Sequence, residues 1–184
     1  MSKNKSESLP NKAYDLAFKY EKEHGGCGMA MVAAIQDVFG LSAGNAFKGA
    51  TGLSGGVGGS GFMCGALTGG VIAIGLKYGM KRSAWDKRII TEEQWKSKEH
   101  IYERMKVRNK AHEFAKRLSS KFIEKYGSVL CHDIQKKIFG RSFDLHDPKD
   151  VVEFNKAGAH VDKCPMVVGT AARWVAEMLL SEEE

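Results

Sequence analysis

Proline is scarce in this chain, with 3 residues among 184, and charged residues make up 27% of it. Disordered chains have few apolar residues and much charge, so the 43% hydrophobic content excludes global disorder and predicts a packed core. No segment alternates apolar and polar residues as a β-strand does, which argues against a sheet protein. A chain of this length is expected to form a single domain.

The N-terminal segment MSKNKSESLPNKAYDLAFKYEKEH lacks both the apolar core of a signal peptide and a twin arginine. We therefore expect a cytoplasmic protein. The stretch from Gly49 to Leu76 has no charged residue and is long enough to span a bilayer. It is rich in glycine, however, and its strongly apolar part is confined to 62–76. The sequence favours a buried helix preceded by a loop and predicts no membrane span.

The formal net charge of +6 and the pI near 9.1 raise the question of an acidic partner. The basic residues between Lys81 and Arg141 are interleaved with glutamate, and the aromatic residues among them recur at helical spacing. This pattern is typical of solvated helical faces rather than of a surface that stacks bases. No nucleic-acid partner is expected.

Apolar residues at helical spacing predict an all-α domain of about seven or eight helices. Thr91 followed by Glu92 and Glu93 is typical of a helix start. The apolar residues of the helix that follows leave open both an intramolecular bundle and a homodimer. We expect an N-terminal tail over 1–11, the domain over 12–180 and an acidic tail over 181–184. The predicted helices cover about 10–24, 27–39, 42–50, 63–78, 91–126, 130–139 and 164–180, with a connector at 80–90 and a loop at 140–148.

The segment GGVGGSGFMCGALTGGVIAIGLKYG, residues 55–79, contains the G-x-G-x-x-G pattern of nucleotide-binding loops at Gly56, Gly58 and Gly61. That pattern binds phosphate where a strand leads into it and an acid about twenty residues further on binds ribose. Here the preceding residues, FKGATGLSG, do not form a strand pattern, and the first acid that follows is Asp86. The sequence therefore predicts no phosphate-binding loop at this position.

The chain has four cysteines and no C-x-x-C pair, so it lacks the spacing of a zinc ribbon, a thioredoxin-like site or a ferredoxin. In a cytoplasmic protein we expect reduced thiols or metal ligands rather than disulfides. All of them stand at predicted helix starts, whose N–H groups and dipole favour thiolate over thiol. If these helix starts converge, they form an electropositive pocket that would suit an anionic iron–sulfur cluster. If they do not converge, each cysteine is a small buried residue at a helix end. The cysteines are Cys27, Cys64, Cys131 and Cys164.

Glycine beside a cysteine lets the backbone approach a cofactor closely. We therefore expect Gly61, before Cys64, and Gly65 and Gly69, after it, to contribute to cofactor binding. In this interpretation the glycine-rich residues before Cys64 form the loop that precedes that cysteine. Its role would be to shape the backbone around that residue.

The order of the cysteines and the CGALTG segment of residues 64–69 resemble the C-GCAxxG-C-C family of redox-active proteins. The segments FIEKYGSVLCHDI and KCPMVVGTAARWVAEML are also similar to family segments, and the resemblance covers about residues 12–180. Two features depart from the family pattern. Gly28 follows Cys27, where alanine or serine and then glutamine is more usual, and the stretch 80–112 is longer and more charged.

The resemblance implies an electron-transfer or redox protein in which the four cysteines are ligands of an iron–sulfur cluster of [2Fe–2S] type. It also implies a redox partner protein or oxidoreductase. No Ser–His–Asp set, paired-carboxylate motif or metalloprotease helix is present, so an electron carrier or accessory subunit is expected rather than a stand-alone enzyme. His24 and His132, close in sequence to Cys27 and Cys131, are expected to be surface or capping residues.

Two other functions remain open from the residues alone. A thiol–disulfide enzyme or sensor would need two cysteines close in space and one of them exposed. A structural zinc site would use the thiolates only to hold the helices together.

Overall fold

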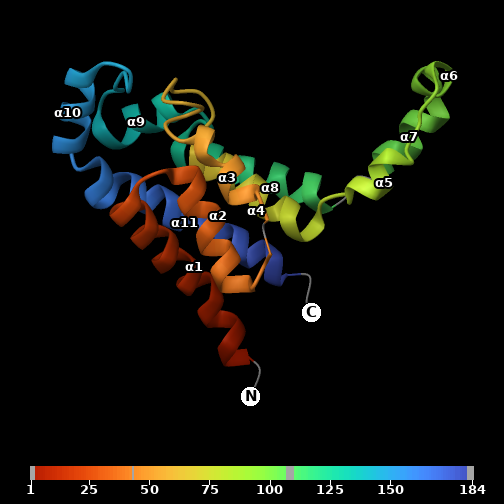
Figure 1. Cartoon of the computed structure of the whole chain (residues 1–184), viewed down its shortest axis with the longest axis horizontal. Helices are drawn as coiled ribbons and strands as arrows, with labels where there is room; N and C mark the ends of the chain where they lie inside the picture. Colours follow the sequence, from red (N-terminus) through yellow and green to blue (C-terminus); the bar gives the residue numbers. More distant parts are fainter. Residues whose placement is uncertain (1–2, 43, 107–109, 182–184) are drawn as a thin grey trace.

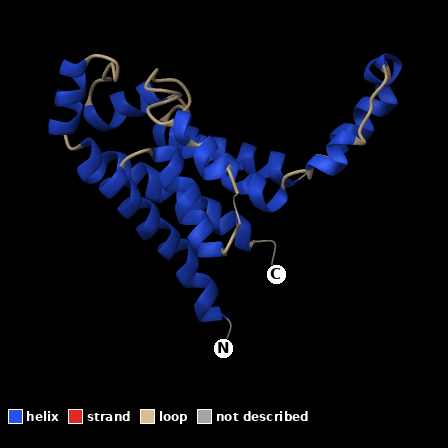
Figure 2. Ribbon diagram, viewed as in Figure 1, coloured by secondary structure: helices blue, strands red, loops and turns tan. Residues whose placement is uncertain are grey.

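The computed structural model describes residues 3–42, 44–106 and 110–181, and over these residues the chain is helical without a β-strand (Figure 2). Eight of its helices have seven or more residues, so the predicted all-α domain and its number of principal helices are confirmed. The elements are α1 (Lys3–His24), α2 (Cys27–Phe39), α3 (Ala46–Gly49), η1 (Thr51–Leu53), α4 (Gly65–Tyr78), α5 (Arg82–Asp86), α6 (Glu92–Lys96), α7 (Lys98–Lys106), α8 (Lys110–Tyr126), α9 (Cys131–Phe139), α10 (Pro148–Lys156), η2 (Ala159–Lys163) and α11 (Cys164–Leu180).

The core lies between α1, α2, α4, α8 and α11, which pack against one another as a bundle. Small residues allow close approach: Ala13 and Ala17 of α1 are fully buried, and a Cβ added to Gly169 of α11 would lie 3.0 Å from the ring of Tyr14. Each fully buried large apolar side chain contributes about 1.5–3 kcal/mol relative to exposure. The largest of them are Met31, Ile35, Leu67, Ile74, Phe114, Leu118, Phe122, Met178 and Leu179.

The start of α4 packs tightly against α2 because glycines face each other. A Cβ added to Gly69 would lie 2.6 Å from the carbonyl oxygen of Gly28. A Cβ on Gly28 would in turn lie 3.0 Å from Cβ of Leu53 and 3.1 Å from the carbonyl oxygen of Ala50. This crowding gives a physical reason for glycine at position 28, where the family pattern has a larger residue.

One end of the bundle is covered by α9, α10 and the glycine-rich loop, while α5, α6 and α7 form an arm that projects away from it (Figure 1). The predicted continuous helix over 91–126 is wrong. Thr91 does begin a helix, with a capping box to Gln94, but α6 ends at Lys96. The Ser97 hydroxyl then accepts a hydrogen bond from the backbone N–H of His100, in the first turn of α7, which begins at Lys98. A serine that can cap a new helix competes with continuation of the old one.

Other elements also differ from the predicted ones. The predicted connector over 80–90 contains helix α5, the helix predicted from residue 63 begins at Gly65, and the one predicted over 42–50 is limited to α3. Helix α1 begins at Lys3, so Pro10 lies inside it rather than in its first turn, and the residues described within the predicted tail are helical. Helix α10 was not predicted, because Asp147-Pro148 was interpreted as loop. In the structure Asp147 is an N-cap whose carboxylate accepts from the backbone N–H of Lys149, and Pro148 occupies the first helical turn.

None of the helices in the described part of the chain combines the length and apolar character needed to cross a membrane.

Candidate functional site

All four cysteines line one cavity of about 440 Å³ at the covered end of the bundle. Each comes from a different element, and Cys27, Cys64 and Cys131 stand at helix starts, as the sequence predicts. At Cys164 the π-helical turn η2 runs directly into α11, and the N–H of Cys164 donates to the carbonyl of Ala159. Cys27, Cys131 and Cys164 are the first residues of α2, α9 and α11, and Cys64 directly precedes α4. The volume of this cavity falls in the range of cavities that hold cofactors or small ligands. We call this space the cysteine cavity.

Backbone hydrogen bonds hold two of the cysteines side by side. Met63 and Leu130 form an isolated antiparallel bridge. Around it, the N–H of Cys64 donates to the carbonyl of Val129 over 2.9 Å, and the N–H of Cys131 donates to the carbonyl of Phe62. The starts of α4 and α9 are thereby joined through main-chain atoms alone.

The glycine that follows Cys64 makes room for another cysteine. A Cβ added to Gly65 would overlap Sγ of Cys27 and lie 2.9 Å from the carbonyl oxygen of Leu53. Gly69 lies against α2, as described above, and the carbonyl of Gly61 accepts from the backbone N–H of His132. The three glycines predicted to contribute to cofactor binding therefore support the cysteines from outside. The glycines that line the cavity are Gly25, Gly26, Gly55, Gly58 and Gly59.

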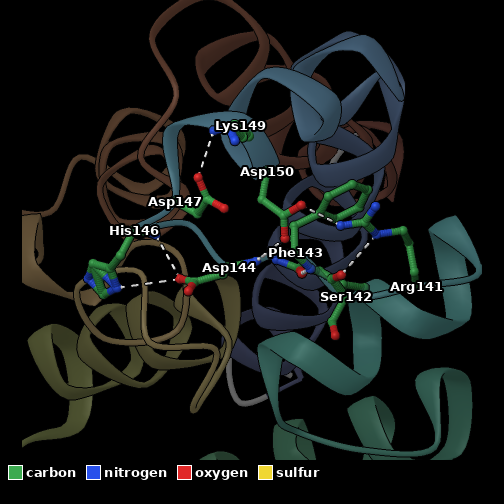
Figure 3. A network of polar contacts seen from close by, with 9 residues as sticks. Arg141, Ser142, Phe143, Asp144, His146, Asp147, Lys149 and Asp150 are labelled. Atoms are coloured by element: carbon green, nitrogen blue, oxygen red, sulfur yellow. Dashed lines mark hydrogen bonds and ion pairs between the residues drawn. The ribbon is translucent and has the colours of Figure 1, made fainter.

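The loop between α9 and α10 closes the cavity through Leu145, which lies against Gly55 of the glycine-rich loop. A polar network around Asp150 fixes the shape of this loop between α9 and α10 (Figure 3). The Asp150 carboxylate accepts from the backbone N–H of Asp144 and from the guanidinium of Arg141, and both contacts lower the pKa of Asp150. Phe143 of the same loop packs against Phe139 and Phe154, so the polar network and a small apolar cluster together place the loop.

Gln135 is a functional candidate that the sequence interpretation did not identify. Its side chain is buried, and Nε2 donates to Sγ of Cys131 over 3.6 Å. Its Oε1 accepts from the backbone N–H of Phe143 over 2.9 Å, which fixes the orientation of the amide. The spacing of four residues from Cys131 within a predicted helix is a signal that could have placed Gln135 on the same face.

Glu21 and His160 were also missed. Both line the cavity, and Oε1 of Glu21 lies 3.3 Å from Nδ1 of His160. Nothing in the sequence marks them: Glu21 stands in a charged segment typical of a solvated face, and His160 lies in a stretch without a predicted element. By contrast His24 is exposed beside Glu23, and His132 contacts Gly61 and Asp133 without lining the cavity.

Burial controls the chemistry of the thiols. It raises the pKa of Cys27, Cys64 and Cys131 to about 12, and raises that of Cys164 well above the usual range. The backbone N–H groups of Ala66 and Leu67 at the start of α4 lower the pKa of Cys64, but by less than burial raises it. At Cys27 and Cys64 the backbone N–H groups thus lower the pKa, in the direction expected at helix starts, but desolvation of the thiol raises it by more.

We expect the metal-free protein to lose stability at alkaline pH. Unfolded thiols ionise at about pH 8.5, whereas the folded protein keeps Cys27, Cys64 and Cys131 protonated up to about pH 12. Between these values the unfolded state binds fewer protons, so the free energy of unfolding falls as pH rises. Urea denaturation at increasing pH, paired with thiolate absorbance, measures both effects. Thiolate formation in the folded protein below about pH 8 would contradict the burial argument.

The chain matches the family model described as "Putative redox-active protein (C_GCAxxG_C_C)" over residues 25–178. No curated protein and no solved structure matches the chain. The matched residues include every cysteine, the whole of α2, α4 and α9, and all but the last two residues of α11. This chain belongs to the C-GCAxxG-C-C family of redox-active proteins.

Proposed function

We propose that this protein is an electron carrier or redox subunit that holds an iron–sulfur cluster, of [2Fe–2S] type, in the cysteine cavity. The supporting observation is that four thiols from separate parts of the chain line one cavity. A cluster bound there supplies one-electron transfer, which thiols alone do not perform. The proposal includes a cytoplasmic location and a redox partner protein or oxidoreductase that exchanges electrons with it.

The residues of the cavity fit a sulfur-rich group. The N–H of Gly55 lowers the pKa of Cys27, those of Ala66 and Leu67 lower that of Cys64, and Gln135 donates to Cys131. Donors of this kind stabilise the charge on ligand and cluster sulfurs. The Ser54 hydroxyl lines the cavity, is buried and has no hydrogen-bond partner among the described residues. It is therefore available to donate to a group in the cavity.

The separation between the possible metal ligands favours a centre of several atoms over a single zinc ion. Within residues 3–42, 44–106 and 110–181, no three His, Cys, Asp or Glu side chains come close enough together to hold one metal ion. The cysteines surround a space instead of meeting at a point. A tetrahedral zinc site requires its ligands to converge within about 2.3 Å of the ion.

The raised pKa values argue against a thiol–disulfide enzyme. A thiol attacks as its thiolate, and reactive cysteines have lowered pKa values at exposed, electropositive positions. Here burial raises the pKa of every cysteine; Cys64 is only 6% exposed, and Cys27, Cys131 and Cys164 are partly buried. The thiols suit ligands that are deprotonated when a metal binds.

Protein purified under anaerobic conditions is expected to be brown, with visible charge-transfer absorption and equal amounts of iron and sulfide. The test is iron, sulfide and zinc analysis with a reductive titration of the absorption. Colourless protein with stoichiometric zinc supports the structural site and contradicts the proposal. Metal-free protein that takes up no iron and sulfide on reconstitution, but forms disulfides reversibly, supports the thiol enzyme instead.

A further inference from the structure

Two titratable side chains other than the thiols line the cysteine cavity, Glu21 and His160. Glu21, on α1, is 2% exposed. One carboxylate oxygen, Oε1, lies 3.3 Å from Nδ1 of His160, which is an ion-pair contact. Neither Nδ1 of His160 nor the other carboxylate oxygen, Oε2, has a hydrogen-bond partner among the described residues, although both atoms are buried. A buried carboxylate that is only half compensated is costly. Its place in the wall of the cavity therefore calls for a function.

His160 connects this carboxylate to the surface. Its side chain is 41% exposed, so one ring nitrogen faces Glu21 while part of the ring meets solvent. It lies in η2, a π-helical turn between α10 and Cys164, and its ring packs edge-on against Phe154 with centroids 5.8 Å apart. Such π-turns are rare and frequently occur at functional sites. The two side chains together lead from the cavity to the outside.

The other elements around the pair contribute no charged side chain to the cavity. Helices α2, α4, α9 and α11 contribute thiols, α10 contributes Phe154, and η1 with its following loop contributes Thr51 and Ser54. Among the described residues that line the cavity, none is a lysine, an arginine or a second acid. A change of charge in the cavity can therefore be compensated locally only by Glu21 and His160.

We propose that Glu21 and His160 form a proton path between the cysteine cavity and solvent, so that reduction of the centre bound in the cavity takes up a proton. This inference rests on the proposed function. The electron comes from an external one-electron reductant, the partner protein in the cell or dithionite in vitro. The proton comes from solvent to Nε2 of His160, and the proton on Nδ1 passes to Oε1 of Glu21. One negative and one positive charge arrive together, so the net charge of the cavity is unchanged.

The acid–base properties of the pair agree with this role. The contact with Glu21 raises the pKa of His160, and burial opposes that effect without cancelling it. The pKa of His160 therefore lies above the value of about 6.5 that an unperturbed histidine has.

The test is the reduction potential of the cluster-loaded protein as a function of pH. In the unmodified protein we expect the potential to fall by about 59 mV per pH unit over part of the range from about pH 5 to pH 9, the value for one proton per electron. Glu21→Gln and His160→Gln are expected to remove this slope. His24→Gln is the matched control: it removes an exposed imidazole three residues before Cys27, and should keep the slope.

A flat potential in the unmodified protein, or a slope that survives both substitutions, overturns the proton path while leaving the iron–sulfur proposal intact. If no cluster forms in any preparation, the proposed function fails, and the pair is tested in the metal-free protein by NMR titration of His160. In the metal-free protein, the midpoint of the His160 titration is expected to fall in Glu21→Gln and to remain unchanged in His24→Gln. An unchanged midpoint in Glu21→Gln shows that the two residues share no proton, and overturns the path.

Discussion

Serine in place of any one of Cys27, Cys64, Cys131 or Cys164 is expected to remove most of the bound iron and sulfide, or to make the cluster labile. The thiols line one cavity from separate elements, so no neighbouring thiol can take over from a missing one. Loss of a direct ligand should exceed the roughly 10- to 100-fold loss of affinity that follows removal of a group hydrogen-bonded to a ligand. Iron and sulfide per chain, with the visible spectrum, measure the effect.

His132→Ala is the control for these variants, because it removes a ring next to Cys131 that does not line the cavity. It should retain the cluster. Circular dichroism and thermal melts of the metal-free serine variants separate loss of a ligand from loss of the fold. A serine variant with full iron, sulfide and spectrum would show that its cysteine is not a ligand. Four such variants would refute the iron–sulfur proposal.

Gly65→Ala is expected to destabilise the metal-free protein by about 1–3 kcal/mol, the usual cost of overpacking. The added methyl group would overlap Sγ of Cys27 and press on the carbonyl oxygen of Leu53, which is backbone and cannot turn aside. The displaced thiol should also reduce cluster loading. The measurement is urea denaturation of the metal-free protein, followed by iron content after reconstitution.

Gly75→Ala is the matched control on the same helix. A Cβ at position 75 meets no atom within 4 Å, and α4 continues past it to Tyr78. Alanine there should be neutral or add about 0.5–1 kcal/mol, because it lowers the entropy of the unfolded chain. Equal stability of the two variants would mean that the crowding around Gly65 is relieved at no cost, and the packing argument would be wrong.

The cysteine positions were predictable from sequence because local chemistry marks each helix start. Glycine precedes Cys27 and lies near Cys64 and Cys131, and Pro165 follows Cys164, so the breaks between helices are visible in the residues themselves. Their meeting at one cavity followed only from the family resemblance, because spacing along the chain carries no information about convergence. The same local chemistry led to error at Ser97 and Asp147, where a capping residue was interpreted as helix interior or as loop.

The supporting residues of the cavity could not be predicted, because burial is a property of the whole fold. Glu21 follows Tyr20 in a segment of mixed charge, and only the packing of α1 against α11 and η2 shows that it faces inward. The same packing decides the ionisation of the thiols. A helix start with free N–H groups predicts a thiolate, yet the surrounding apolar residues keep Cys64 a thiol.

The position of Cys164 in the sequence determines when, during synthesis, the cysteine cavity can form. It opens α11, which is the last helix in the described part of the chain and packs against α1 near the other end. During synthesis, Cys27, Cys64 and Cys131 emerge from the ribosome before α11 does. Until then, α11 does not cover the apolar faces of α1 and α2. Assembly of the proposed cluster would therefore require α11 to be in place, and a product truncated before α11 would lack one of the four thiols and expose the apolar residues of α1 that α11 covers.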